Sequence, residues 1–257
     1  MGVVGLWVLL KKNGYEPVLR YQDSRPPQPF NSALRVDVLG SLFGDIRRAY
    51  SSHSGEVSHR IVEQAISRLG PKDNIVLYLD GLPCDEKKET EETRKERRAK
   101  ALERAEKHLV KFEDRVQNGA RIRKQHFTNV RKNLKLGFYW TLESRRAFAE
   151  YMRGRHWNVV ECPFEADPMI ATDCRPGDIV VTRDSDALVY GSIETIWRPT
   201  SKGCTLAYSV PGVLTSLGLS RDQLTVLGIV SKNDYQSNLS SLGPVTNFKI
   251  VKTLHGG

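Results

Sequence analysis

The chain has 257 residues, enough for one large α/β domain or for one domain with an elaborate insertion. Hydrophobic residues make up 39% of it, which supports a buried core, and no apolar run is long enough to cross a membrane, which argues against a membrane-spanning protein. The formal net charge of +9 predicts a polyanionic partner, most simply a nucleic acid.

The sequence predicts neither a secretory signal nor a cysteine framework. The opening stretch MGVVGLWVLLKKNG is apolar but short, has no basic residue before its apolar run and lacks a small-residue cleavage site. The four cysteines show no C-x-x-C spacing, so neither a zinc site nor a set of disulfides is indicated. They are typical of a reducing compartment.

Short apolar strands alternate with helices along the chain. Residues 1–11 predict a short apolar helix or turn, and helical spacing of apolar positions predicts a helix at 56–69. We expect four strands, at 34–37, 74–80, 157–162 and 178–184. This alternation indicates an α/β fold with a largely parallel sheet, in which ligands bind beyond the carboxyl ends of the strands.

Acidic residues stand at the ends of these expected strands. Asp37 and Asp80 end the first two, and two acid-x-acid pairs follow the last two: Glu165 with Asp167, and Asp184 with Asp186. Carboxylates that converge at one sheet edge repel each other unless a cation lies among them, and oxygen-only ligands suit Mg²⁺ or Mn²⁺. The alternative is that each acid only caps a helix.

The middle of the chain has a different composition. Residues 85–116 are highly charged and predict a long helix, which Asn118 and Gly119 end. Between Arg121 and Arg155 inclusive, ten residues are Lys or Arg and only two are Glu, and aromatic residues are interleaved among them. We interpret this block as a surface that follows nucleic-acid phosphates; the alternative is a solvated helical face with its own small core.

Three cations of the charged helix have a helical spacing. Lys87, Arg94 and Arg98 are seven and eleven residues apart, so they share one face, which begins seven residues after Asp80. A cationic ridge beside a metal site could hold and neutralise a phosphodiester.

The last segment predicts two helices around a polar turn. Ser220 caps an apolar helix, residues 236–241 form the turn, and the final helix covers 244–254. Two helices around such a turn can present backbone groups to a duplex phosphate backbone.

Six ordered blocks of the sequence resemble the structure-specific 5′ nucleases of the flap endonuclease and XPG type. They are MGVVGLW, RVDVLGSLF, YLDGLPCDEKKETEETRKERR, FEADPMIA, TRDSDALVYGS and GIVSKNDYQSNLSSLGP. The resemblance implies a single nuclease domain over 1–257 with a PIN-like three-layer α/β/α fold and a mostly parallel central sheet. It further implies an N-terminal part (1–84), a helical arch insertion (85–155) and an internal part (156–257) with a helix–two-turn–helix motif at about 222–255.

The resemblance also implies roles for individual residues. Two Mg²⁺ ions, replaceable by Mn²⁺, would be held by Asp37, Asp80, Glu165, Asp167, Asp184, Asp186 and Asp234. Lys87 and Arg94 would contact the phosphate as catalytic residues. DNA contacts would come from Gly2, Phe43, Arg97, Arg98, Arg131, Lys132, Ser241 and Gly243. A K⁺ ion would bind in the loop of the helix–two-turn–helix motif.

Some positions depart from the family pattern. Asp167 replaces a more usual Glu and is followed by Pro168, and Asn233 stands where Ser is common. Residues 241–243, Ser-Leu-Gly, replace a Gly-x-Gly in the loop expected to bind K⁺.

The resemblance implies hydrolysis of DNA that carries a 5′ flap, a junction or a free 5′ end, by a nuclear protein of the DNA-repair type that acts as a monomer. No sliding-clamp motif and no membrane partner are expected. Two alternatives stay open: a non-catalytic nucleic-acid-binding or scaffold protein with a PIN-like fold, and an RNA-directed PIN-type ribonuclease, because no residue here reads a 2′-OH specifically.

Overall fold

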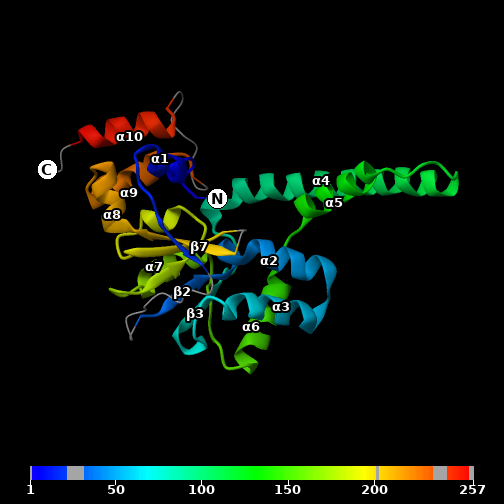
Figure 1. Ribbon diagram of the computed structural model, residues 1–257, viewed down its shortest axis with the longest axis horizontal. Helices are drawn as coiled ribbons and strands as arrows, with labels where there is room; N and C mark the ends of the chain where they lie inside the picture. Colours follow the sequence, from blue (N-terminus) through cyan, green and yellow to red (C-terminus); the bar gives the residue numbers. More distant parts are fainter. Residues whose placement is uncertain (1, 22–31, 201–202, 234–241, 255–257) are drawn as a thin grey trace.

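A seven-stranded sheet forms the centre of the computed structural model, which describes residues 2–21, 32–200, 203–233 and 242–254 (Figure 1). The strands are β1 (Val18–Tyr21), β2 (Leu34–Asp37), β3 (Ile75–Leu79), β4 (Asn158–Glu161), β5 (Ile179–Val181), β6 (Thr195–Pro199) and β7 (Cys204–Ser209). Their order in the sheet is β1-β7-β6-β5-β2-β3-β4. The strands from β6 to β4 are parallel, whereas β7 and β1 add an antiparallel end.

The order of the strands reverses beside β2. From β2 the chain builds outward through β3 to β4, and it then returns to place β5 on the other side of β2. In parallel sheets such a switch point opens a crevice at the carboxyl ends of the strands, which is where ligands bind. The register aligns these ends, since Asp37 of β2 lies opposite Tyr78 of β3.

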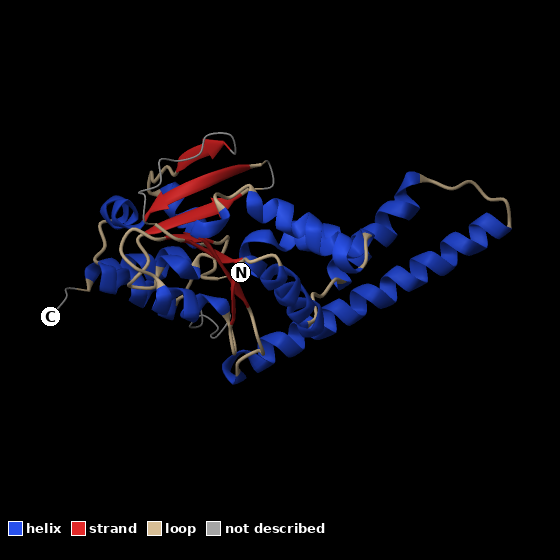
Figure 2. Ribbon diagram, turned by 90° about the horizontal axis from the view of Figure 1, so that it is seen from below, coloured by secondary structure: helices blue, strands red, loops and turns tan. Residues whose placement is uncertain are grey.

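Helices cover both faces of the sheet, giving three layers (Figures 1 and 2). One face is covered by α1 (Leu6–Lys12), α7 (Ala166–Asp173), α8 (Val210–Leu217), α9 (Arg221–Val230) and α10 (Pro244–Thr253). The other face is covered by α2 (Val38–Ser52), α3 (Gly55–Ser67) and α6 (Leu142–Gly154). Strand residues alternate between the two cores, as Leu77 and Leu79 face one and Tyr78 the other. The three-layer α/β fold expected from the sequence is confirmed.

A long helical hairpin extends away from this body (Figures 1 and 2). It consists of α4 (Lys88–Gln117), preceded by the 3₁₀ turn η2 (Asp85–Lys87), and α5 (Lys124–Gly137), which packs along α4. Gly137 lies close to α4, since a Cβ added there would overlap the Leu102 side chain unless that side chain moved. The two remaining 3₁₀ turns are η1 (Lys72–Asn74) and η3 (Asp186–Leu188).

Most sequence-predicted elements are confirmed within about two residues. The strand expected at 178–184 ends at Val181, because the following residues turn into the acidic loop. Strands β1, β6 and β7 were not predicted, since their sequences carry no clean alternation. The N-terminal helix, the capping of α9 by Ser220 and the final helix are all present. The polar turn at 236–241 lies outside the described residues.

The expectation of one continuous phosphate-binding surface over 121–155 is wrong for its second half. Trp140 and Phe148 are buried in the core against α2 and α3, and Arg145 is only 7% exposed. Arg153 and Arg155 pair with Glu161 and Glu63. These residues belong to α6 and its flanks, which pack on the sheet because their apolar positions form a stripe.

In the described part of the chain, no helix combines the length and apolar character that a membrane span requires.

Candidate metal centre

Six acidic residues meet at the switch point of the sheet. Asp37 is the last residue of β2, and Asp80 directly follows β3. Glu165 and Asp167 lie at the start of α7, while Asp184 and Asp186 occupy the loop after β5. Carboxyl ends of neighbouring parallel strands share one edge, so four separate chain segments deliver carboxylates to the same place. Asp234, the seventh predicted ligand, lies outside the described residues.

Three of these acids form a tight group. Asp167, Asp184 and Asp186 each offer a carboxylate oxygen, and these oxygens lie within 4.8 Å of one another. An oxygen-only donor set of high negative charge suits a hard divalent cation such as Mg²⁺ or Mn²⁺ and does not suit zinc, which prefers nitrogen and sulfur. The residues present therefore fit the predicted metal.

The other carboxylates are close enough to perturb each other electrostatically. Burial, followed by the charge of Asp80, raises the pKa of Asp37 to about 7. Burial and the charges of Asp37 and Asp184 hold the pKa of Asp167 well above its usual value, and burial likewise raises the pKa of Asp80. Without a cation, this arrangement favours protonated acids; a bound divalent cation would reverse that preference.

Hydrogen bonds hold Asp37 in place. Its Oδ1 accepts a hydrogen bond from the Gly40 amide at 2.8 Å, so Asp37 also caps α2. Its Oδ2 accepts one from Thr182 Oγ1 at 2.8 Å, and the same hydroxyl accepts from the Asp184 amide at 3.1 Å. Thr182 thus couples two acidic segments. Sequence reasoning missed it; the signal was a polar residue at the end of an apolar strand.

Asp80 is fixed through both its side chain and its backbone. Its Oδ1 accepts a hydrogen bond from the Ala166 amide at 2.8 Å, which ties the loop after β3 to the start of α7. Arg145 of α6 donates to the carbonyls of Asp80 and Gly81 at 2.8 and 3.1 Å. Arg145 was also missed as a site residue, because in sequence it is indistinguishable from the surrounding surface cations.

Helix α7 is anchored at its other end as well. The Tyr78 hydroxyl on β3 donates to Asp173 at 2.8 Å and accepts from Arg35 on β2 at 2.6 Å. Arg35 forms a buried ion pair with Asp178 at 2.6 Å. Both ends of α7 are thereby attached to the strands that carry Asp37 and Asp80, so the positions of these acids are linked.

Lys87 places a cation inside the acidic group. Its ammonium lies 2.7 Å from Glu165, and the residue is only 6% exposed. Arg94 pairs with Glu91 at 2.8 Å, and Arg98 lies over the Tyr139 ring at 4.5 Å. The expected cationic ridge therefore starts at the acids and continues along α4, although Lys87 belongs to the preceding 3₁₀ turn.

The remaining predicted site residues that the structure describes lie in four different regions. Gly2 is buried against the acids; its φ is +90°, and an added Cβ would overlap Asp184. Phe43 is exposed on α2 with its ring 5.9 Å from Phe138, and Gly243 precedes α10 as its N-cap. Arg97, Arg131 and Lys132 are exposed on the hairpin, and Ser241 lies outside the described residues.

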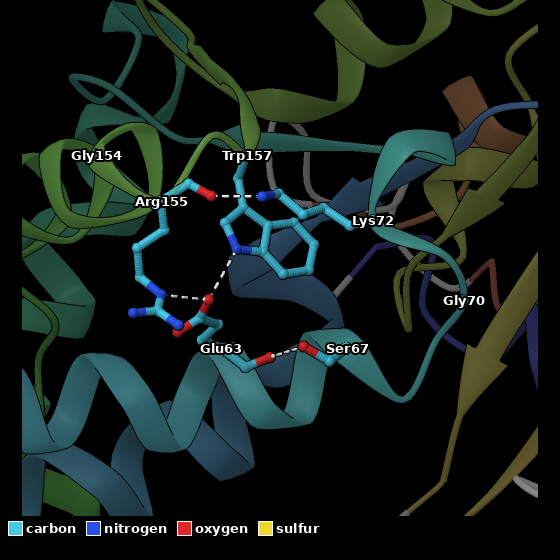
Figure 3. A pocket seen from close by; sticks show the side chains of 7 residues that line it. All are labelled: Glu63, Ser67, Gly70, Lys72, Gly154, Arg155 and Trp157. Carbon is cyan, nitrogen blue, oxygen red and sulfur yellow. Dashed lines mark hydrogen bonds and ion pairs between the residues drawn. The ribbon is translucent and has the colours of Figure 1, made fainter.

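A separate pocket of about 460 Å³ lies at the opposite, amino-terminal edge of the strands (Figure 3). There the buried Glu63 accepts hydrogen bonds from Tyr151, Arg155 and Trp157. Lys72 donates to the Arg155 carbonyl across the pocket. The polar groups here are used to join α3, α6 and β4, and the pocket contains a single acid, so its chemistry does not resemble that of the acidic centre.

Comparison with known proteins gives a consistent family match. Residues 156–234 match the XPG I-region. Flap endonuclease 1 of Glycine max is 25% identical over all of this chain and 67% of its own length, so the chain spans about two thirds of that relative.

Solved structures share the fold. The catalytic core of Rad2 in complex with DNA substrate has a TM-score of 0.56 at 19% identity, and the match covers 97% of this chain and 68% of the Rad2 core chain. Human GEN1 in complex with Holliday junction DNA has a TM-score of 0.58 at 17% identity, and the match covers all of this chain and 56% of the GEN1 chain in that structure.

The acidic group should make the metal-free protein less stable as the pH rises. The folded protein keeps protons on Asp37 and Asp167 that the unfolded chain releases near pH 4, so the free energy of unfolding in EDTA should fall between about pH 4 and pH 7. At pH 7.5 in EDTA, Asp167→Asn should raise the free energy of unfolding in urea titrations, because it removes one of the repelling charges. With Mg²⁺ the wild type should gain more stability than the variant.

The matched control is Asp73→Asn, an exposed acid outside the group, which should change stability little. A decrease in stability for Asp167→Asn in EDTA would contradict the mutual repulsion.

Proposed function

The chain belongs to the XPG and flap endonuclease family of structure-specific nucleases, and from this premise we propose that it is a divalent-metal-dependent 5′ nuclease. It hydrolyses phosphodiester bonds in DNA that carries a 5′ flap, a junction or a free 5′ end. The observation that carries the proposal is the meeting of six carboxylates and one buried lysine at the switch point of the sheet.

The carboxylates would hold two Mg²⁺ ions, which Mn²⁺ can replace. Asp167, Asp184 and Asp186 supply one compact oxygen group, and Asp37, Asp80 and Glu165 supply the adjoining oxygens. When bound, such ions supply the charge that activates a water molecule and stabilises the departing oxygen. The proposal also includes Asp234 as a further metal ligand. It separately includes a K⁺ ion bound in the loop of the helix–two-turn–helix motif.

The cations position the phosphate. Lys87, held at the acids by Glu165, reaches the scissile phosphate and neutralises charge that develops during attack on phosphorus. Arg94 acts about two turns further along, on α4. Phosphates away from the cut are held by Arg97, Arg98, Arg131 and Lys132 on the hairpin, with Gly243 and Ser241 contacting the duplex.

Gly2 and Phe43 complete the proposed substrate contacts. Gly2 allows the N-terminal segment to lie against Asp184, where no larger residue fits. Phe43 offers an exposed ring to a base near the cut, and base stacking is tolerant of sequence.

The nucleic-acid partner is proposed as DNA because the similar solved structures were determined with DNA substrate or Holliday junction DNA. A nuclear, monomeric protein without a membrane partner is part of the same proposal. A scaffold protein would have no need to keep six mutually repelling acids together. Replacing the deoxyribose at the cut by ribose separates a DNA enzyme from an RNA-directed one.

Removing one metal-binding charge should abolish cleavage but preserve binding. Asp184→Asn deletes a negative charge beside the phosphate, so affinity for a 5′-flap DNA should stay equal or rise, while the single-turnover rate in Mg²⁺ should fall by orders of magnitude. Wild-type cleavage should vanish in EDTA and return with Mn²⁺. If Asp184→Asn cleaves as fast as the wild type, the acidic group is not the active site and the scaffold alternative is favoured.

Removing the buried cation should affect the rate more than the affinity. Lys87→Ala should lower the single-turnover rate by about a hundredfold or more, because losing one donor to a reacting group typically costs about 3 kcal/mol. Its affinity should change little, since the exposed hairpin cations share that load. The control is Lys95→Ala, an exposed lysine of the same helix, for which we expect a nearly unchanged rate. Equal losses in both variants would indicate a general electrostatic effect.

A further inference from the structure

Two large apolar side chains are exposed directly beside the acids. Leu82 follows Asp80 by two residues and is 56% exposed. Phe164 precedes Glu165 by one residue and is 53% exposed. With consecutive Cα atoms about 3.8 Å apart, neither side chain is more than two residue lengths along the backbone from a proposed metal ligand.

Hydrogen bonds join the two segments that carry these side chains. The Leu82 amide donates to the Pro163 carbonyl at 3.0 Å, and the Gly81 amide donates to the Phe164 carbonyl at 2.5 Å. The segments are so close at this point that a Cβ on Gly81 would overlap the backbone of Cys162 and Pro163. The backbone segments that carry Leu82 and Phe164 are therefore hydrogen-bonded neighbours, and each segment also carries an acid: Asp80 precedes Leu82 and Glu165 follows Phe164.

Side-chain and backbone interactions of three residues hold this backbone in place. Arg145 donates to the carbonyls of Asp80 and Gly81 from the core, and the Ala166 amide donates to Asp80 Oδ1. Lys87 pairs with Glu165, the residue that follows Phe164. The exposure of Leu82 and Phe164 is thus a property of a fixed surface and is not explained by a loose loop.

Single exposed apolar residues are common on proteins and require no explanation. Here, however, two of them lie beside a charged centre. The carboxylates of this centre attract cations, and Lys87 attracts a phosphate. Carboxylates repel the phosphates of a nucleic acid, so the part of a nucleotide that suits an apolar surface beside them is the uncharged base. The base attached to a phosphate at the acids lies within one nucleotide's length of this surface.

We propose that Leu82 and Phe164 form a nucleobase-binding subsite, which packs against the base of the nucleotide whose phosphate is cleaved. This inference rests on the proposed nuclease function and deepens it. A base can reach the surface only when it is unpaired, so the subsite favours substrates whose terminal base pair is open or already absent. Recognition is independent of sequence, because every base presents an aromatic face.

The subsite predicts an energetic coupling between the side chains and the base. We would compare wild type and the double variant Leu82→Ser with Phe164→Ser on two 5′-flap DNAs, one intact and one with an abasic nucleotide at the cut. Affinities are measured in Ca²⁺ and single-turnover rates in Mg²⁺. The abasic nucleotide should weaken wild-type binding or cleavage by about fivefold or more, and should have little effect on the double variant.

Controls separate this effect from a general change. The single variant Phe164→Tyr keeps the aromatic ring and the wild-type Leu82, so it should remain as sensitive to the abasic nucleotide as the wild type. Val57→Ser removes an exposed apolar side chain from α3 and should behave as wild type. Urea unfolding of all variants checks that the fold is retained, as expected for exposed positions.

The possible outcomes also distinguish a failure of the subsite proposal from a failure of the proposed nuclease function. Equal abasic effects in wild type and double variant, in both affinity and rate, would overturn the subsite. Absence of wild-type cleavage on every substrate would overturn the proposed nuclease, and the affinity comparison in Ca²⁺ would still decide whether the base binds at Leu82 and Phe164.

Discussion

Repulsion among buried and half-buried carboxylates is the constraint on which the rest of this structure depends. Six acids from four segments converge where the strand order reverses, and burial, followed by their mutual charges, raises the pKa of Asp37, Asp80 and Asp167. A fold that keeps them together needs rigid supports, and those supports are visible: Thr182 between two acids, Arg145 beneath Asp80, and the Arg35–Tyr78–Asp173 chain at the far end of α7. Protonation of these acids and the Lys87 ammonium relieve part of this repulsion, and bound divalent cations would relieve more of it, which links the fold to the proposed chemistry.

The same centre explains the form of the surrounding elements. The Gly2 backbone must lie against Asp184, and the 3₁₀ turn before α4 delivers Lys87 to Glu165, so the long hairpin starts at the acids. The hairpin carries exposed cations away from the body, whereas Arg145 of α6 is used inside it. Positive charge therefore falls into two classes, one for structure and one available to a polyanion.

Much of this arrangement could be predicted from the sequence because local patterns determined it. The strand at 34–37 and the helix starting at Ser220 follow from apolar periodicity and capping, and the acids stand at strand ends in the printed sequence. What failed depended on long-range pairing. Strand β1 forms only by pairing with β7 nearly two hundred residues later, and Thr182 meets Asp37 only through the register of β5 against β2. Arg145 could not be told from surface arginines, because burial is a property of the packed helix and leaves no mark in composition.

The central claim is that these carboxylates form one divalent-cation site at the switch point. The most direct test is anomalous diffraction from crystals of the protein soaked in Mn²⁺, with data collected above and below the manganese absorption edge. The account predicts anomalous peaks bounded by the carboxylate oxygens of Asp167, Asp184 and Asp186, and a second peak toward Asp37 and Asp80. Well-ordered carboxylates with no manganese peak among them, at concentrations that occupy ordinary two-metal sites, would contradict it.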